Sequence, residues 1–144
     1  FGGLIFEQCL NKCIIAPSTV VAHKNIFYDV GLFDESIKIC EDYEMWLRIT
    51  AKYKVGFNPK ELITKYGGYN DQLSNVQEGI EYYHIQALEK LLNKKILIGS
   101  KFTMTKKMLI EKLKIYLRGI EKRERMDQVL KYKEKIIFWK NFNE

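Results

Sequence analysis

The chain has 144 residues, of which 47% are hydrophobic and 13% aromatic, a composition that supports one compact core and excludes a disordered or fibrous polymer. No apolar stretch approaches the roughly 20 residues of a membrane-spanning helix, and no basic segment precedes an apolar one near the start, so we expect neither a membrane span nor a signal peptide. The net charge of +6 is unevenly divided: residues 1–89 hold 8 Lys and Arg against 12 Asp and Glu, and residues 90–144 hold 16 against 6.

The basic tail has two interpretations. It is either a pair of amphipathic helices with solvated lysine faces or a surface that rests on anionic lipid head groups. No helix-turn-helix, zinc-finger or RNA-recognition pattern is present, so we expect no nucleic acid partner.

Cys9, Cys13 and Cys40 lack the spacing of a disulfide framework or zinc site and are predicted to be reduced core thiols, which favours a cytoplasmic location.

In chain order, apolar residues recur at helical spacing over residues 4–13 and predict a short amphipathic helix. The β-branched run 19–23 predicts a buried strand. Residues 24–30 are expected to form a short helix stopped by Gly31. After a loop, residues 41–53 predict a helix whose inward stripe includes Met45, Trp46 and Ile49.

The second half of the chain is expected to be largely helical. Residues 55–57 and 62–66 predict two short strands around a turn. A capping box from Ser74 to Gln77 is expected to open a helix that ends near Asn93. Two further apolar stripes predict antiparallel helices, one from about Thr103 and one after the basic segment 121–125.

The acidic pair Glu41-Asp42 is the most informative chemical feature. Acids in the first turn of a helix are stabilised by the free amides there, and most are simply caps. Here, however, Asp42 shares a helix face with Trp46, and Arg48 stands four residues after Glu44 as an ion-pair partner. A partly buried carboxylate at this position is a candidate general base.

Several segments in order resemble the acceptor half of bacterial family 2 glycosyltransferases. They are PSTVV at residues 17–21, VGLFDE at 30–35 and CEDYEMWLR at 40–48. KYGGYNDQLS at 65–74 and YHIQALEKLL at 83–92 resemble the loop and helix that follow in one bacterial branch. The resemblance implies the C-terminal part of a GT-A (nucleotide-diphospho-sugar transferase) fold: an α+β, mostly helical chain with a small sheet remnant. Residues 1–92 would form its acceptor-side half and 93–144 a basic helical extension.

The resemblance also implies an inverting transfer in which an aspartate takes the proton of an acceptor hydroxyl that attacks a nucleotide sugar. By its place in the Glu-Asp motif, Asp42 would be the base, and Glu41 would orient the acceptor or tune the charge. The other candidate substrate-binding residues are Ser18, Thr19, Trp46, Arg48 and Tyr69. For three of them a structural role stays open: a loop position for Ser18, a strand start for Thr19, and a core position for Trp46.

The implied cofactor of the full-length parent is a divalent cation, Mg2+ or Mn2+. The chain lacks the Asp-x-Asp motif that holds this cation, and it has Tyr69 where that branch usually carries a histidine, so we assign no metal ligand and expect the isolated piece to be inactive. The implied partners are a nucleotide-sugar donor and a glycan or lipid-linked acceptor of polysaccharide biosynthesis. Exposed apolar faces also favour a homodimer.

The second hypothesis belongs to a different functional class. In it, residues 93–144 are a basic helical interaction module that docks on a partner protein or on an anionic membrane at the inner face of the cell. Asp42 discriminates between the two hypotheses, because it lines a cleft beside Trp46 in the first and is an ordinary exposed cap in the second.

Overall fold

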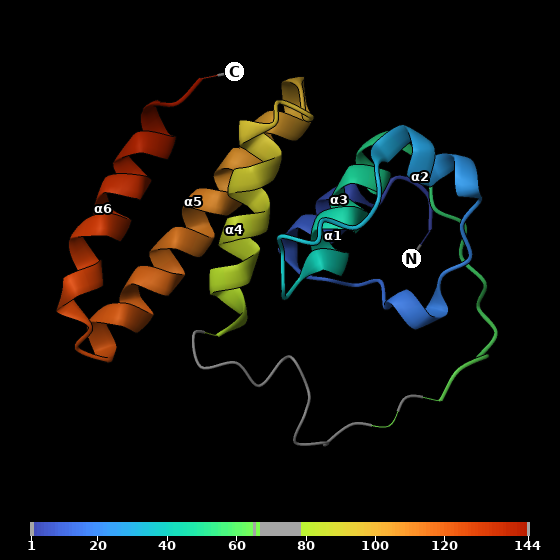
Figure 1. Ribbon diagram of the computed structural model, residues 1–144, viewed down its shortest axis with the longest axis horizontal. Coiled ribbons are helices and arrows are strands. Elements are labelled where there is room, and N and C mark those ends of the chain that lie inside the picture. The colour runs from blue at the N-terminus through green and yellow to red at the C-terminus, as the bar shows by residue number, and fades with distance from the viewer. Residues whose placement is uncertain (1, 65, 67–78, 144) are drawn as a thin grey trace. The chain divides into compact units, whose positions relative to one another are not determined.

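The computed structural model describes residues 2–64, 66 and 79–143, and the chain divides into two compact units, Phe1–Ile80 and Glu81–Glu144. The helices in the described residues, labelled in Figure 1, are α1 (Phe6–Asn11), the 3-10 turn η1 (Pro17–Thr19), α2 (Lys24–Val30), α3 (Glu41–Lys52), α4 (Ile80–Asn93), α5 (Gly99–Lys122) and α6 (Met126–Asn141). The predicted functional boundary at residue 92 stays a prediction.

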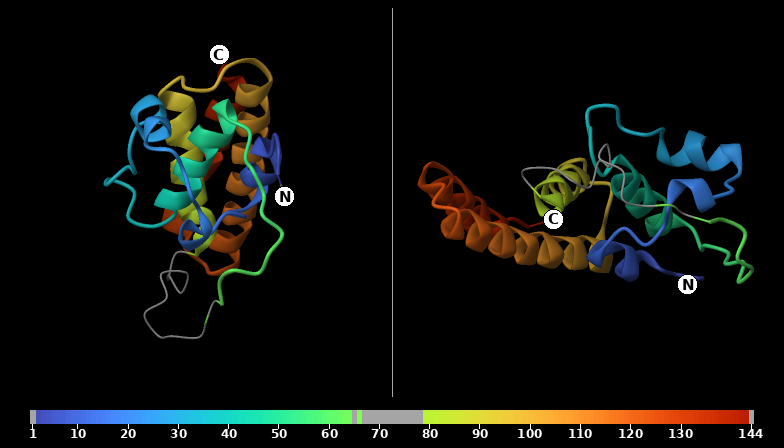
Figure 2. Two further views of the ribbon diagram at one scale, coloured as in Figure 1. Left: turned by 90° about the vertical axis from the view of Figure 1, so that its right-hand side faces the viewer. Right: turned by 90° about the horizontal axis from the view of Figure 1, so that it is seen from below.

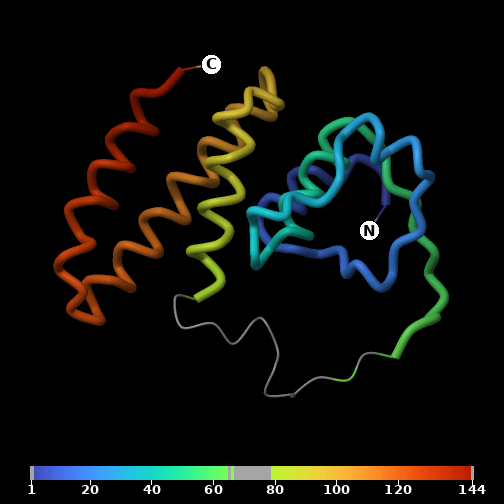
Figure 3. The backbone as a smooth tube through the Cα atoms, in the orientation of Figure 1, coloured from blue at the N-terminus to red at the C-terminus, as the bar shows by residue number. Residues whose placement is uncertain are grey.

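The first unit is built around α3. Residues 43–50 of this helix are all buried, and both α1 and α2 pack against it. The hydroxyl of Tyr43 donates to the backbone oxygen of Leu10 over 2.7 Å, which satisfies a carbonyl in the last turn of α1. Long irregular segments connect these helices, as the backbone trace in Figure 3 shows.

The apolar core of this unit includes a cluster on one side of α3. It is formed by the buried side chains of Met45, Trp46 and Ile49. Partly buried residues from α2 and the loops pack on this cluster: Ile15, Val20, Ile26, Phe27, Val30 and Tyr53. The predicted inward stripe of α3 is thus confirmed, and it fixes the segment before η1 as well as α2.

The predicted sheet remnant is wrong. Residues 17–19 form the turn η1, Val20 continues in extended backbone, and Val21 belongs to no strand and has a fully exposed side chain. A strand persists only when a neighbouring strand takes its backbone hydrogen bonds, and none does so within the described ranges. An isolated antiparallel bridge between Gly3 and Val55 is all that remains of the predicted strand 55–57. The described fold is mostly helical, as expected, but it is not an α+β part of a GT-A fold.

The predicted helix boundaries hold for part of the first unit. The helix α2 covers the predicted residues 24–30, and Gly31 ends it with a φ of 87° and an amide that donates to Phe27. The first helix is shorter than predicted, because the chain turns to extended backbone at Lys12. The predicted loop 65–74 and the capping box from Ser74 to Gln77 lie outside the described residues, apart from Tyr66.

The second unit contains α4 and a hairpin of α5 and α6, which run antiparallel and side by side in Figures 1 and 2. The hairpin turns at Glu124, a residue with a positive φ of 56°. The helix α5 largely buries its predicted apolar face, although it begins at Gly99, about one turn earlier than expected. The face predicted for α6 is only partly correct, because Val129, Ile136 and Trp139 are buried while Met126, Leu130 and Ile137 are exposed. The fully buried side chains include Leu109, Leu113 and Ile120.

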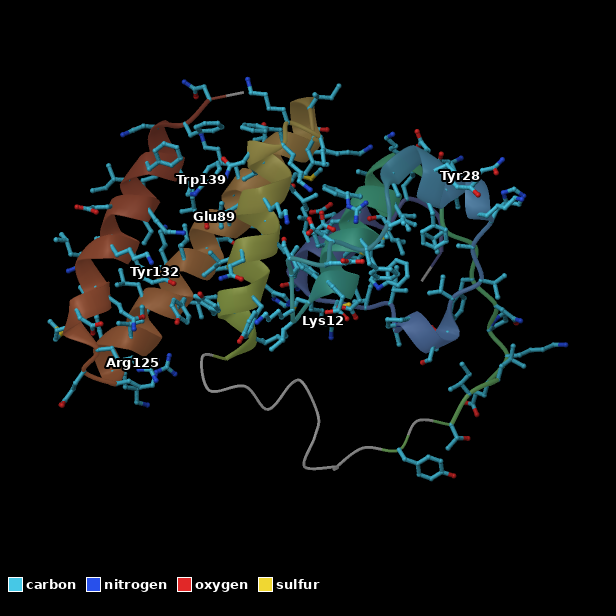
Figure 4. All side chains as sticks on the ribbon, in the orientation of Figure 1. Lys12, Tyr28, Glu89, Arg125, Tyr132 and Trp139 are labelled. Atoms are coloured by element: carbon cyan, nitrogen blue, oxygen red, sulfur yellow. The ribbon has the colours of Figure 1, made fainter. Side chains whose placement is uncertain are left out.

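Polar side chains connect α4 to the hairpin. Glu89 accepts hydrogen bonds from Lys135 at 2.6 Å and from the indole nitrogen of Trp139 at 3.0 Å, and Figure 4 shows Glu89 and Trp139 as neighbours. Lys112 is buried, with its ammonium 3.0 Å from Glu81 and 3.2 Å from Nδ1 of His84.

None of the helices described here has both the length and the apolar character needed to cross a bilayer.

Candidate functional site

The acidic pair lies in the first turn of α3, as predicted, and both Glu41 and Asp42 are half-buried. The helix is preceded by Cys40, whose backbone is left-handed, with a φ of 66° and a ψ of 25°. This conformation is unfavourable for a residue with a side chain, costing on the order of 1 kcal/mol, and such residues concentrate at functional sites. The free amides of the first turn favour negative charge on these carboxylates.

Two donors hold the carboxylate of Asp42. Its Oδ1 accepts the backbone amide of Tyr43 at 2.7 Å, and its Oδ2 accepts the thiol of Cys13 at 3.4 Å. Since each carboxylate oxygen has two lone pairs, both oxygens keep acceptor capacity for a further donor. The arrangement therefore combines a fixed orientation with the capacity to accept a proton.

The contact with Cys13 was not predicted. Cys9 and Cys40 are buried, as expected of core thiols, whereas Cys13 is exposed and does not belong to the core. Desolvation of the sulfur, followed by the negative charge and hydrogen bond of Asp42, raises the pKa of the Cys13 thiol to about 12. The group is therefore a protonated thiol at neutral pH. The sequence placed Cys13 on an apolar helical stripe, and only the end of α1 at Asn11 frees it for this contact.

Trp46 lies one helical turn after Asp42 and belongs to the core. Its side chain is only 5% exposed and meets the ring of Phe33 edge-on, with centroids 6.2 Å apart. The indole nitrogen has no hydrogen-bond partner among the described residues. Packing against the apolar cluster thus accounts for the ring, while its predicted contact with a sugar stays a prediction.

Arg48 is bound to the protein through all five of its N–H groups. It forms the predicted ion pair with Glu44, at 2.8 Å, and both side chains are buried. The other guanidinium donors reach the backbone oxygens of Val30, of Gly31 at 3.1 Å and of Leu32 at 2.9 Å. Because a guanidinium has five donors, none is left for a substrate in this arrangement. Arg48 instead ties the end of α2 and the loop after it to α3.

The remaining predicted substrate-binding residues are less closely connected to Asp42. Ser18 and Thr19 are exposed in η1, and the hydroxyl of Thr19 donates to the backbone of Ala16 at 2.7 Å. Within the described ranges, neither hydroxyl is hydrogen-bonded to Asp42. Tyr69 lies outside the described residues.

A metal site does not emerge from the part of the chain that the structure describes, because no three His, Cys, Asp or Glu side chains are grouped to hold an ion. The pair Cys13 and Asp42 offers only one carboxylate and one protonated thiol, a poor set for Mg2+ or Mn2+, which prefer several oxygen ligands. The described residues therefore do not fit the implied cation.

Comparison with known proteins gives a partial match. The chain is 37% identical over 62 residues to a protein of Rickettsia felis named an uncharacterized glycosyltransferase, and equally to one of that name in Rickettsia conorii. The match covers 43% of this chain and 10% of each relative, so the chain spans a small part of the length of these proteins. No family model and no solved structure matches the chain. The chain is therefore similar, over a limited segment, to proteins that are named glycosyltransferases.

Proposed function

We propose that the chain supplies the acceptor side of an inverting glycosyltransferase of the family 2 type, with Asp42 as the general base. The observation that carries the proposal is the half-buried carboxylate of Asp42 at the start of α3, held by two donors and still able to accept a proton. The names of the two Rickettsia relatives support the coarser part of the proposal, glycosyl transfer. The substrates would be a nucleotide-sugar donor and a glycan or lipid-linked acceptor, used at the cytoplasmic side of the membrane.

In the proposed reaction, Asp42 takes the proton of an acceptor hydroxyl as that oxygen bonds to the anomeric carbon of the donor. The bond from this carbon to the diphosphate breaks on the opposite side, and the nucleoside diphosphate leaves with the bonding electrons. General base catalysis of this kind contributes about 10²- to 10⁴-fold to the rate. Glu41 would orient the acceptor beside Asp42. We route no step through a cation, because the described residues do not fit one.

The test is donor turnover by the full-length protein that carries this chain. A panel of nucleotide sugars with Mn2+ would be incubated with candidate acceptors, and the anomeric configuration of the product would be determined by NMR. We expect one donor to be consumed with inversion, and Asp42→Asn to lower transfer by about 100-fold or more while circular dichroism stays unchanged. Absence of turnover with any donor, or retention of configuration, would contradict the proposal.

A second candidate function has its own structural support. Residues 81–144 hold 16 Lys and Arg against 8 Asp and Glu, and α6 exposes four large apolar side chains, of which Met126, Leu130 and Ile137 form one stripe. These residues lie on a different face from the buried Val129 and Trp139, as their helical spacing requires. An apolar stripe in a basic unit suits an anionic membrane surface.

Co-sedimentation of the protein with phosphatidylserine vesicles tests this candidate. Binding that falls at high salt and in a Leu130→Gln, Ile137→Gln variant would support it. Binding to neutral vesicles alone would contradict recognition of an anionic membrane. Concentration-dependent dimers that the same substitutions abolish would indicate that a second copy of the chain covers the apolar stripe.

A further inference from the structure

We propose that Cys13 is a positioning residue for the candidate base, its thiol fixing the carboxylate of Asp42 in the orientation that receives the acceptor proton. The inference rests on the proposed function and adds a residue to it. Its basis is the hydrogen bond from the sulfur of Cys13 to Oδ2 of Asp42, 3.4 Å long, between residues 29 positions apart in the sequence.

The backbone brings Cys13 to this position by ending α1 early. At Lys12 the φ is −155° and the ψ is 160°, so the chain leaves the helix and runs in extended form beside the start of α3. The hydrogen bond from Tyr43 to Leu10 anchors the last turn of α1 on α3 just before this point. The half-buried Ile15 packs on the apolar cluster of α3 just after it. Cys13 is thus held between two anchored residues although its own side chain is exposed.

The two donors act on different oxygens of the carboxylate. The Tyr43 amide bonds to Oδ1 and the Cys13 thiol to Oδ2, so together they restrict rotation of the carboxylate plane. A thiol is a weak donor, and it orients the carboxylate while costing little of its capacity to accept another proton. The sulfur also lies 3.4 Å from the backbone oxygen of Ile15, which offers the thiol hydrogen an alternative acceptor when Asp42 is protonated.

Cys13 is suited to this role because it stays protonated. Although part of the residue is exposed, the atoms around its sulfur desolvate it, and this desolvation together with the adjacent Asp42 raises the pKa of the thiol to about 12, well above the ordinary value of 9.0. At neutral pH the thiol is therefore a hydrogen-bond donor and not a nucleophile. The same coupling supplies a direct measurement, because the charge of Asp42 should control the reactivity of Cys13.

The first test measures this coupling in the chain itself, without any activity assay. The rate of Cys13 alkylation by iodoacetamide would be followed between about pH 7 and pH 11, with the modified residue located by mass spectrometry. We expect slow alkylation in the natural protein and at least ~tenfold faster alkylation near pH 9 for Asp42→Asn, since each unit of pKa is a factor of ten in thiolate. Asp29→Asn is the matched control, because Asp29 bonds to Lys52 and Tyr53 instead.

The inference would be overturned if Cys13 in the natural protein were alkylated at the rate of an ordinary thiol and Asp42→Asn left that rate unchanged. Such a result would leave the role of Asp42 as the base untouched, so the two proposals can fail independently.

The second test uses transfer by the full-length protein. We expect Cys13→Ala to lower kcat by about tenfold, with the KM for the donor unchanged, because a misplaced catalytic group slows the chemical step. Cys13→Ser retains a hydrogen-bond donor and should recover most of the rate. Equal loss in the alanine and serine variants, or full activity of Cys13→Ala, would contradict a positioning role. Full activity of Asp42→Asn would instead contradict the proposed function, whatever the alkylation test shows.

Discussion

The two units of the chain bury charged side chains in different ways. In the first unit, Arg48 reaches from α3 to three backbone oxygens of an irregular segment and pairs with Glu44 on its own helix. In the second unit, the buried Lys112 and the partly buried Glu89 bond to side chains of neighbouring regular helices. The first arrangement fixes a loop, and the second reinforces helices that already have extensive apolar faces.

The two units therefore differ in how strongly their stability depends on single residues. A loop has no hydrogen-bond ladder of its own, so the loss of one buried side chain frees several backbone groups at once. Packed amphipathic helices keep their backbone bonds and most of their buried area when one polar link is removed. We therefore expect the largest effects of substitution in the first unit.

The largest expected effect is that of Arg48→Met. It leaves the carboxylate of Glu44, which is fully buried, without its partner, and breaking a buried pair in this way costs about 3–5 kcal/mol. The measurement is urea unfolding followed by the fluorescence of Trp46, in a Trp139→Phe background so that the signal reports the first unit.

Lys52→Met is the matched control for this change. Lys52 lies on the same helix and pairs with Asp29, but both of these side chains are about half exposed. Exposed pairs contribute at most about 1 kcal/mol. Equal destabilisation by the two substitutions would show that Arg48 does not have the special role described for it.

A smaller effect is expected for Lys112→Met in the second unit. The substitution keeps the buried stem but removes the donor to Glu81 and His84, which should cost about 1–3 kcal/mol. Unfolding followed by Trp139 fluorescence, in a Trp46→Phe background, measures it. The exposed pair of Lys133 and Glu121 provides the control, and a Lys133→Met variant as unstable as Lys112→Met would refute the distinction.

The loss of one hydroxyl should have a similar or smaller effect. Tyr43→Phe removes the hydrogen bond to the buried carbonyl of Leu10, which we expect to destabilise the first unit by about 1–2 kcal/mol. Tyr28, whose side chain is exposed, supplies the comparison through Tyr28→Phe, expected to be neutral. The two values come from the same urea titrations, and a neutral Tyr43→Phe would argue against the anchoring of α1 on α3.

The smallest effect is the loss of stability that begins just above pH 9. The pKa of Cys13 is raised from 9.0 to about 12, so the unfolded chain releases this proton first, and the first unit loses stability as the pH rises above 9. In the second unit, burial raises the pKa of Tyr116 and of Tyr132 above 10, so its loss begins at a higher pH. Burial raises the pKa of Cys9 above 9.0 as well, so Cys13→Ser should reduce the first loss without abolishing it and should leave the second unchanged. Loss of both units at one pH in all variants would contradict the ordering.

Local features of the structure could be predicted from the sequence. The helix that begins at Glu41, the short helix closed by Gly31 and the apolar face of α5 depend on periodicity and end residues, and all are present. The pairing of Glu44 with Arg48 also follows from helical spacing alone.

Features that depend on distant segments could not be predicted. The run at residues 19–23 has strand composition, but a strand needs a neighbour that no local pattern specifies. The bonds from Arg48 to the end of α2 depend on the path of a loop, and the approach of Cys13 to Asp42 depends on where α1 ends. The acidic pair was therefore predictable as a candidate site, while the residues that hold it were not.

A comparison of Asp42→Asn with Glu41→Gln in the full-length protein tests most directly whether Asp42 is the general base. The two substitutions remove neighbouring carboxylate charges from the same helical turn, so their effects on the local field should be similar, and circular dichroism checks that both variants stay folded. If Asp42 is the base, Asp42→Asn lowers kcat by about 100-fold or more and Glu41→Gln by much less. Full activity of Asp42→Asn, or a greater loss in Glu41→Gln, would contradict the assignment of Asp42 as the base.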